Sequence, residues 1–136
     1  DNGQMKTKTL WQNHGLVNNK EWHENGQLKV EINYVDSQPS GLIKTYYDNG
    51  QLKKEENYKE GTNDGLEQAW YKNGQLAYKI NYVKGKKDGV SKKWYKSGSI
   101  YRELTYVKGS LTYKKEWYEN GQLKNDHNRD KNIYKK

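Results

Sequence analysis

The stretch Trp70-Tyr71-Lys72-Asn73-Gly74-Gln75-Leu76 decides the fold of this 136-residue chain, because variants of it recur from residue 1 to residue 123. It joins two aromatic residues to an Asn-Gly turn, and a Gln and a Leu follow the turn. The intervals between the turn glycines are 23, 24, 24, 24 and 23 residues, which indicates stacked supersecondary units. These glycines are Gly3, Gly26, Gly50, Gly74, Gly98 and Gly121.

Each unit is predicted to contain two β-strands. Residues 28–34 and 76–82 alternate apolar and polar side chains, as a half-buried strand does, whereas residues 52–58 place Lys54 and Glu56 in apolar positions. The second strand is expected at about residues 66–71, after a loop at residues 61–65. Connections this short leave no room for crossover helices, so neighbouring strands should be antiparallel. The predicted fold class is all-β: an elongated, single-layer, twisted antiparallel sheet of about five tandem β-hairpin repeats.

The Asn-Gly turn allows a two-residue or a three-residue loop. A loop of Asn49 and Gly50 alone would place Tyr47 opposite Leu52, whereas a loop of residues 48–50 with a bulged, left-handed Gly50 would place Tyr46 there. The x-Asn-Gly pattern favours the three-residue form. One apolar face is then expected to carry the structural aromatic columns Trp22, Tyr46, Trp70, Trp94 and Trp117 beside Tyr34, Tyr58, Tyr82 and Tyr106. The next column, His23, Tyr47, Tyr71, Tyr95 and Tyr118, is expected on the opposite face.

The terminal units differ from the middle ones. Twelve residues separate the Tyr34-type aromatic from the next Trp-type aromatic in the three middle units, and eleven separate them in the first and last. Atypical end units are usual in repeat arrays. We expect the array to span residues 1–124 and a polar C-terminal tail to span residues 125–136. The first residue is Asp1 and lies within a repeat, which indicates a processed or trimmed chain.

At these residues the chain resembles the MORN repeat, in the variant class found in bacterial proteins, with the pattern W/Y-Y-x-N-G-x-L followed by Y and D-G. The resemblance covers about residues 1–124 and implies an elongated, twisted sheet of successive β-hairpins. The family has no catalytic residues that could be assigned to positions of this chain. Many bacterial proteins with this variant are labelled YwqK-family antitoxins of toxin–antitoxin systems, and others are predicted to be secreted or surface proteins. Gly41, Gly65 and Gly89 match the loop glycine of the family, whereas Thr112 stands near that place in the last unit.

The sequence offers no recognisable catalytic, metal or cofactor chemistry. There is no Cys, and the three histidines, His14, His23 and His127, have no spacing typical of a metal site or a catalytic triad. Asp36, Asp64 and Asp88 lie beside loop residues, where turn formation explains them better than calcium binding does. No apolar run is long enough to span a membrane. We therefore predict that the protein is not an enzyme and needs no cofactor or metal.

Two features are candidates for binding. The column of Tyr47, Tyr71, Tyr95 and Tyr118 would lie on a face that a single-layer sheet leaves open, although packing between hairpins is the simpler role for most of the aromatics. The second feature is charge: residues 1–68 carry −3 and residues 69–136 carry +11, within a total of +8. A Lys-rich solvated surface explains this balance, and a basic patch for an acidic partner is the alternative. The lysines of that patch would be Lys84, Lys86, Lys87, Lys92 and Lys93.

The function predicted from these features is a non-catalytic scaffold for protein–protein interaction, resembling antitoxin components of toxin–antitoxin systems. One alternative is a secreted or surface-exposed bacterial interaction protein. Another is a binder of anionic ligands, acidic lipid or nucleic acid, through the basic C-terminal half. The antitoxin-like role implies the cytoplasm, and a signal peptide before Asp1 would imply the cell surface or secretion. The sequence leaves the compartment and the oligomeric state open.

Overall fold

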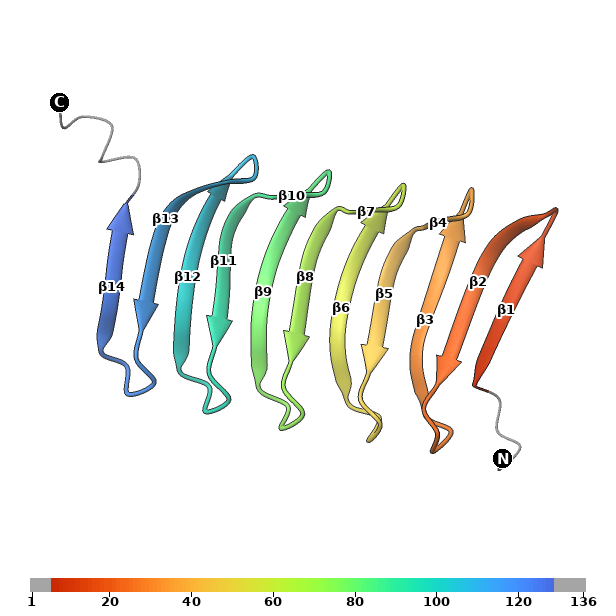
Figure 1. Cartoon of the computed structure of the whole chain (residues 1–136), viewed down its shortest axis with the longest axis horizontal. Coiled ribbons are helices and arrows are strands. Elements are labelled where there is room, and N and C mark those ends of the chain that lie inside the picture. Colours follow the sequence, from red (N-terminus) through yellow and green to blue (C-terminus); the bar gives the residue numbers. More distant parts are fainter. Residues whose placement is uncertain (1–5, 129–136) are drawn as a thin grey trace.

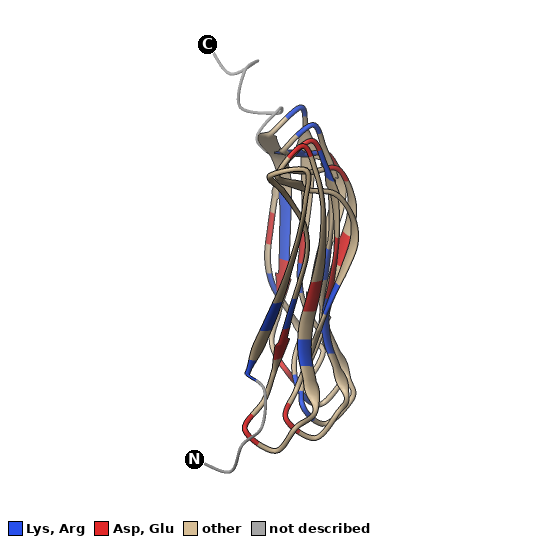
Figure 2. Ribbon diagram, turned by 90° about the vertical axis from the view of Figure 1, so that its right-hand side faces the viewer, with Lys and Arg blue, Asp and Glu red and all other residues tan. Residues whose placement is uncertain are grey.

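A computed structural model describes residues 6–128, and these residues form one open antiparallel sheet (Figure 1). Each strand lies beside its neighbours in the sequence, so the chain is a simple meander. Figure 2 views the sheet from its side and shows one thin, twisted layer. The predicted all-β, single-layer architecture is therefore confirmed. The strands are β1 (Thr7–Gln12), β2 (Gly15–Trp22), β3 (Leu28–Val35), β4 (Gln38–Pro39), β5 (Gly41–Tyr46), β6 (Leu52–Lys59), β7 (Thr62–Asn63), β8 (Gly65–Trp70), β9 (Leu76–Val83), β10 (Lys86–Lys87), β11 (Gly89–Trp94), β12 (Ile100–Val107), β13 (Ser110–Trp117) and β14 (Leu123–Asn128).

The Asn-Gly turn has three residues, as predicted. The Tyr71 amide donates to the Gln75 carbonyl at 2.8 Å, and the Gly74 amide donates to the Tyr71 carbonyl at 2.9 Å. Gly74 has a φ of +86°, the left-handed conformation of a bulged three-residue hairpin. The Asn73 side-chain oxygen accepts the Gln75 amide at 3.0 Å, so the Asn supports the turn with its own side chain. Gly3, the first turn glycine of the sequence, lies outside the described residues.

A β-bulge follows each of these turns and changes which side chains share a face. In the pair β8–β9, Trp70 lies opposite Leu76 but Ala69 lies opposite Tyr78, so Ala77 is an extra residue. The extra residue turns the rest of β9 over relative to Leu76. The prediction that the Trp column and the Tyr82-type column share a face is therefore wrong, because the bulge shifts the alternation of β9 by one residue.

The sheet has two distinct faces, which we name by their aromatic residues. The tryptophan face carries Trp22, Tyr46, Trp70, Trp94 and Trp117 together with Leu42, Leu66 and Val90. The tyrosine face carries Tyr34, Tyr58, Tyr82 and Tyr106 together with Ile43, Glu67 and Ser91. The Tyr47 and Tyr71 side chains line a hollow with Lys54, Ala69 and Tyr78, which places them on the tyrosine face. They are thus opposite the Trp column, as predicted.

At the other edge of the sheet the turns have two residues, with positive φ at both. Glu60 and Gly61 form one such turn at +49° and +76°, and Thr62–Asn63 already pair with β6. The predicted loop at residues 61–65 is therefore wrong: the turn comes earlier, and Asp64 interrupts the strand that follows it, between β7 and β8. The middle units have two extra residues at this interruption. The terminal units have one extra residue, which is Thr112 in the last unit. This difference explains why twelve residues separate the two aromatics in the middle units and eleven in the terminal ones.

The sheet has little buried interior. Ile43 and Ala69 are the buried apolar residues among those described, and Glu67, Ser91 and Glu116 are the buried polar ones. All five lie on the tyrosine face, which is therefore the better covered side. Strand β14 continues to Asn128, so the predicted boundary at residue 124 falls inside a paired strand. Residues 129–136 of the predicted tail lie outside the described residues.

Candidate functional site

The Tyr47-type column links successive hairpins. The Tyr47 hydroxyl donates to the Trp70 carbonyl at 2.8 Å, and the Tyr71 hydroxyl donates to the Trp94 carbonyl at 2.8 Å. Tyr95 bonds the Trp117 carbonyl in the same way at 3.0 Å, while the His23 Nε2 lies 2.9 Å from the Tyr46 carbonyl. These polar tips are thus used inside the array. Their predicted contact with a partner stays a prediction, and it would have to use the rings.

The rings of this column are partly covered by neighbouring side chains. The ammonium of Lys53 lies 5.5 Å from the centre of the Tyr47 ring, and that of Lys124 lies 5.5 Å from the Tyr118 ring. Each lysine is the extra residue of the bulge after its Asn-Gly turn, Lys53 in β6 and Lys124 in β14. Tyr118 is 49% exposed. It belongs to the last described hairpin, so it is the most open candidate of the column.

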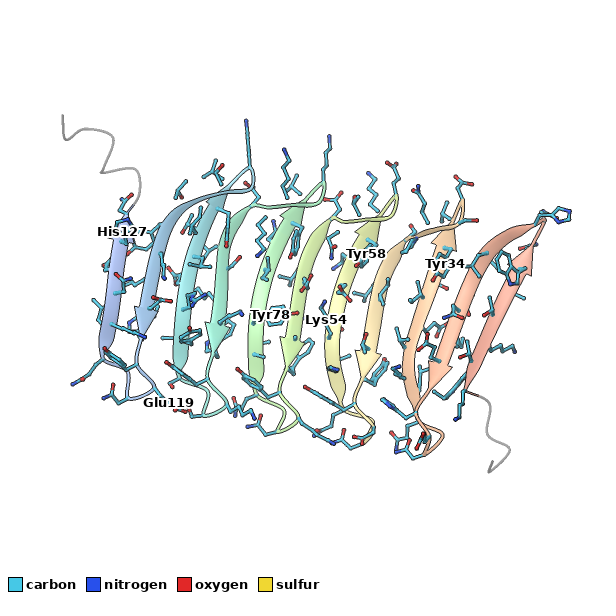
Figure 3. All side chains as sticks on the ribbon, viewed as in Figure 1. Tyr34, Lys54, Tyr58, Tyr78, Glu119 and His127 are labelled. Atoms are coloured by element: carbon cyan, nitrogen blue, oxygen red, sulfur yellow. The ribbon has the colours of Figure 1, made fainter. Side chains whose placement is uncertain are left out.

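A polar cluster occupies the centre of the tyrosine face, around Lys54, Tyr58 and Tyr78 (Figure 3). The Lys54 ammonium lies 2.8 Å from the Glu56 carboxylate and 3.4 Å from that of Glu67. The Tyr78 hydroxyl donates to Glu67 at 2.9 Å. Lys54 and Glu56, which fill apolar positions in the sequence pattern, are therefore explained by pairing with each other.

The electrostatics of this cluster follow from burial and from the two carboxylates. Burial and the hydrogen bond to Glu67 raise the pKa of Tyr78 to about 12. Burial alone would lower the pKa of Lys54, but the contacts with Glu56 and Glu67 outweigh it and raise that pKa above its ordinary value. Lys54 therefore stays charged and Tyr78 stays neutral near neutral pH. The cluster is consequently suited to structure rather than to acid–base chemistry.

The predicted lysine patch is divided between the two faces. Lys92 pairs with Glu103 on the tryptophan face, with 3.1 Å between the charged atoms. Lys87 and Lys93 line a hollow on the tyrosine face. Lys84 and Lys86 border a groove at the two-residue turns. The structure thus brings the five lysines near one another without joining them into one surface.

An exposed apolar row on the tryptophan face was not singled out by the sequence analysis. Its members follow the edge of the two-residue turns and are 40% to 62% exposed. They are Val35, Leu42, Leu66, Val83, Val90 and Val107. Val83 and Val107 also line the groove between Lys84, Lys86 and Lys108. The signal in the sequence was an apolar residue after each loop glycine, but its exposure depends on the face to which the bulges assign it.

The metal-binding candidates have structural roles or stand apart. Among residues 6–128, no group of three His, Asp or Glu side chains is arranged to hold a metal ion. Asp64 and Asp88 each accept the amide of a lysine in the next unit's turn, at 3.3 Å and 2.9 Å. Their expected role in turn formation is confirmed, with the difference that each supports the following turn. The described residues also include no helix with the length and apolar character needed to cross a membrane.

The architecture defines a class of protein, the open tandem β-hairpin arrays. The pattern of the MORN repeat variant matches residues 18–36, 39–60, 63–84, 87–108 and 112–130. The chain therefore belongs to the MORN repeat variant family, and its five matched repeats form a scaffold of the kind used for binding. No curated protein matched the sequence.

Proposed function

We propose that this protein is a non-catalytic scaffold that binds another protein through the apolar row of the tryptophan face. The observation that carries the proposal is the row itself. Six aliphatic side chains are exposed to solvent, because the sheet has a single layer and no second layer covers them. Contiguous exposed apolar side chains with a polar rim are typical of interaction surfaces. The rim here includes the ion pairs of Lys44 with Glu55 and of Lys92 with Glu103.

The test begins with a protein that copurifies with the chain from its source and is then produced on its own. Its affinity is measured by calorimetry for the wild type, for Leu66→Lys and for Val90→Lys. We expect each substitution to weaken binding about tenfold or more, since a central interface residue contributes over about 1 kcal/mol. Leu123→Lys is the matched control, because Leu123 is 51% exposed but lies outside the row. Equal affinities for all four proteins would contradict the proposal.

A finer version of this function is the antitoxin-like role, which the resemblance to YwqK-family proteins supports. The expected partner is then a toxin-like protein, and coexpression should relieve its toxicity. Coexpression of the toxin-like protein with Leu66→Lys or Val90→Lys in place of the wild type should restore the toxicity. A signal peptide in the sequence upstream of Asp1 would favour the secreted or surface-exposed alternative.

The excess of positive charge in the C-terminal half supports a second candidate, the binding of acidic lipid or nucleic acid. Binding of this kind depends on displaced counterions, so it should weaken steeply between 50 and 200 mM salt. Vesicles of phosphatidylserine and a single-stranded oligonucleotide are suitable probes. Salt-independent binding, or none at 50 mM, would remove this candidate.

A further inference from the structure

A basic hollow lies on the tyrosine face between β9, β11 and β12. The cations that line it are Lys87, Lys92, Lys93 and Arg102, of which Lys92 pairs with Glu103. Ile80 and Leu104 supply apolar walls. Ser91 also lines it and is only 7% exposed. Its hydroxyl has no hydrogen-bond partner among the residues that the structure describes. A buried hydroxyl without a partner is unusual, because its desolvation is not compensated.

The preceding repeat shows what can occupy this position. One period of 24 residues earlier stands Glu67, whose carboxylate is held by three groups. The Tyr78 hydroxyl lies 2.9 Å away, the Asn63 side-chain amide 3.3 Å and the Lys54 ammonium 3.4 Å. That unit therefore carries its own carboxylate, with donors arranged around it.

In the unit of Ser91 the carboxylate is missing and its surroundings have become more basic. Asn63 is replaced one period later by Lys87, Tyr78 by Arg102 and Ala69 by Lys93. Serine is too short to reach these cations as a glutamate would. The repeat has thus exchanged an internal anion for a small residue and gained three positive charges around the same place. It has lost one, because Tyr78 stands where Lys54 stands one period earlier.

Among the described residues, carboxylates compensate only part of this positive charge. Within residues 6–128, Lys87 and Lys93 form no ion pair, and their ammonium groups lie over the rings of Tyr106 and Tyr78 at 5.3 and 6.0 Å. Arg102 is already engaged: its Nε lies 2.8 Å from a Glu116 carboxylate oxygen, and its guanidinium donates to the Tyr101 hydroxyl at 2.8 Å. Donors that face a hollow without an acceptor favour an anionic ligand.

We propose that this hollow is a binding site for one carboxylate group, which takes the place that the Glu67 carboxylate has in the preceding unit. It lies on the face opposite the apolar row, so it goes beyond the proposed function and can exist without it. The carboxylate can come from a free small acid or from an acidic side chain of a peptide. Lys87 and Lys93 would hold the charge beside the pair of Arg102 with Glu116, and the Ser91 hydroxyl would donate after rotation about its Cα–Cβ bond.

The first experiment is a titration of the isotope-labelled chain with sodium acetate, followed by amide NMR, with sodium chloride at equal ionic strength as reference. We expect saturable shifts at Ser91 and Arg102 with acetate, and small, unsaturable ones with chloride. A blocked tripeptide with a single glutamate is the second probe. Saturation at a concentration at least ten times lower than with acetate assigns the site to acidic side chains, and equal or tighter acetate binding assigns it to free acids. No saturation by either probe overturns the proposal.

The variant Ser91→Glu restores the internal carboxylate. We expect it to abolish the acetate response and to raise the thermal midpoint by about 3 °C. The double variant Lys87→Ala, Lys93→Ala should weaken acetate binding at least fivefold and tests the site even if Ser91→Glu does not fold. Glu67→Ser is the control, because it creates a serine without the three added cations and should show no saturable response. Unchanged acetate binding in the double variant would contradict the site.

Discussion

At the scale of single residues, the second aromatic of the recurring string acts through its hydroxyl group. Tyr71 donates to the backbone carbonyl of Trp94, which lies 23 residues further on at the end of β11. Pairing between β9 and β11 is confined to Lys92 with Lys79 and Lys93 with Tyr78, so the backbone ladder ends before it reaches the turn. The hydroxyl therefore supplies, near the turn, a hydrogen bond that the ladder leaves out.

Replacing Tyr71 by Phe removes this hydrogen bond and keeps the ring. We expect Tyr71→Phe to lower the free energy of unfolding by about 1 kcal/mol, because a part-buried carbonyl loses its partner. Denaturant unfolding followed by circular dichroism measures the loss. Tyr118→Phe is the control, since Tyr118 belongs to the last described hairpin, and it should cost much less. Equal losses in both variants would show that the hydroxyl of Tyr71 has no special role.

This residue-scale link could not be predicted from the sequence. The aromatic column was recognised, but its acceptor is a main-chain carbonyl, and main-chain carbonyls look the same at every position. The same limit applies to Ser91. The sequence alone shows that Ser91 stands one period after Glu67. It does not show which cations surround Ser91, because these come from three strands whose register depends on the bulges.

At the scale of elements, the two kinds of turn fix the register of the whole sheet. The Asn-Gly turns place a left-handed glycine at one edge, and the two-residue turns place two left-handed residues at the other. The two main strands of each unit followed from the alternation and from the 24-residue period, whereas the two-residue strands β4, β7 and β10 did not. The positions of the bulges did not, because Leu76, Tyr78, Ile80 and Tyr82 read as one continuous alternation although the bulge separates Leu76 from the rest.

The conformational demand of the Asn-Gly turn can be measured at Gly74. A Cβ added there would meet no atom within 4 Å, so Gly74→Ala isolates the cost of the left-handed backbone. We expect a loss of about 1 kcal/mol in the free energy of unfolding. Gly15→Ala is the matched control: its Cβ would make only an ordinary contact of 3.5 Å with the Gln12 carbonyl, and no left-handed φ is involved. A loss no larger at Gly74 than at Gly15 would contradict this account of the turn.

At the scale of the whole molecule, stability comes from neighbouring strands alone. A layer without a second layer has no contacts between distant units, so each hairpin depends on those beside it. Stability should therefore respond to the number of units, provided that the joined strands keep their register.

Removal of one period tests this dependence. Deletion of residues 80–103, which are 24 residues, joins Lys79 to Leu104, the residue equivalent to Ile80. We expect the shortened chain to keep its strand content and cooperative unfolding, with a smaller denaturant slope because less surface is exposed. Deletion of residues 80–104 is the control, since it moves the rest of the joined strand to the wrong face. If both deletions behave alike, the register does not control the assembly.

The interruptions after the two-residue turns give the sheet a mechanical character. A force that pulls the first and last strands apart acts across the strands, and every seam between neighbours carries the same load. The hairpin β8–β9 resists with six cross-strand pairs, whereas the seam between β6 and β8 has two, with two more between β6 and β7 beyond the interruption. The three seams of the middle units, between β3 and β5, β6 and β8, and β9 and β11, therefore yield before the hairpins, and the molecule lengthens one repeat at a time. The Tyr47 and Tyr71 hydroxyls fasten two of these seams near the turns and set how firmly they hold.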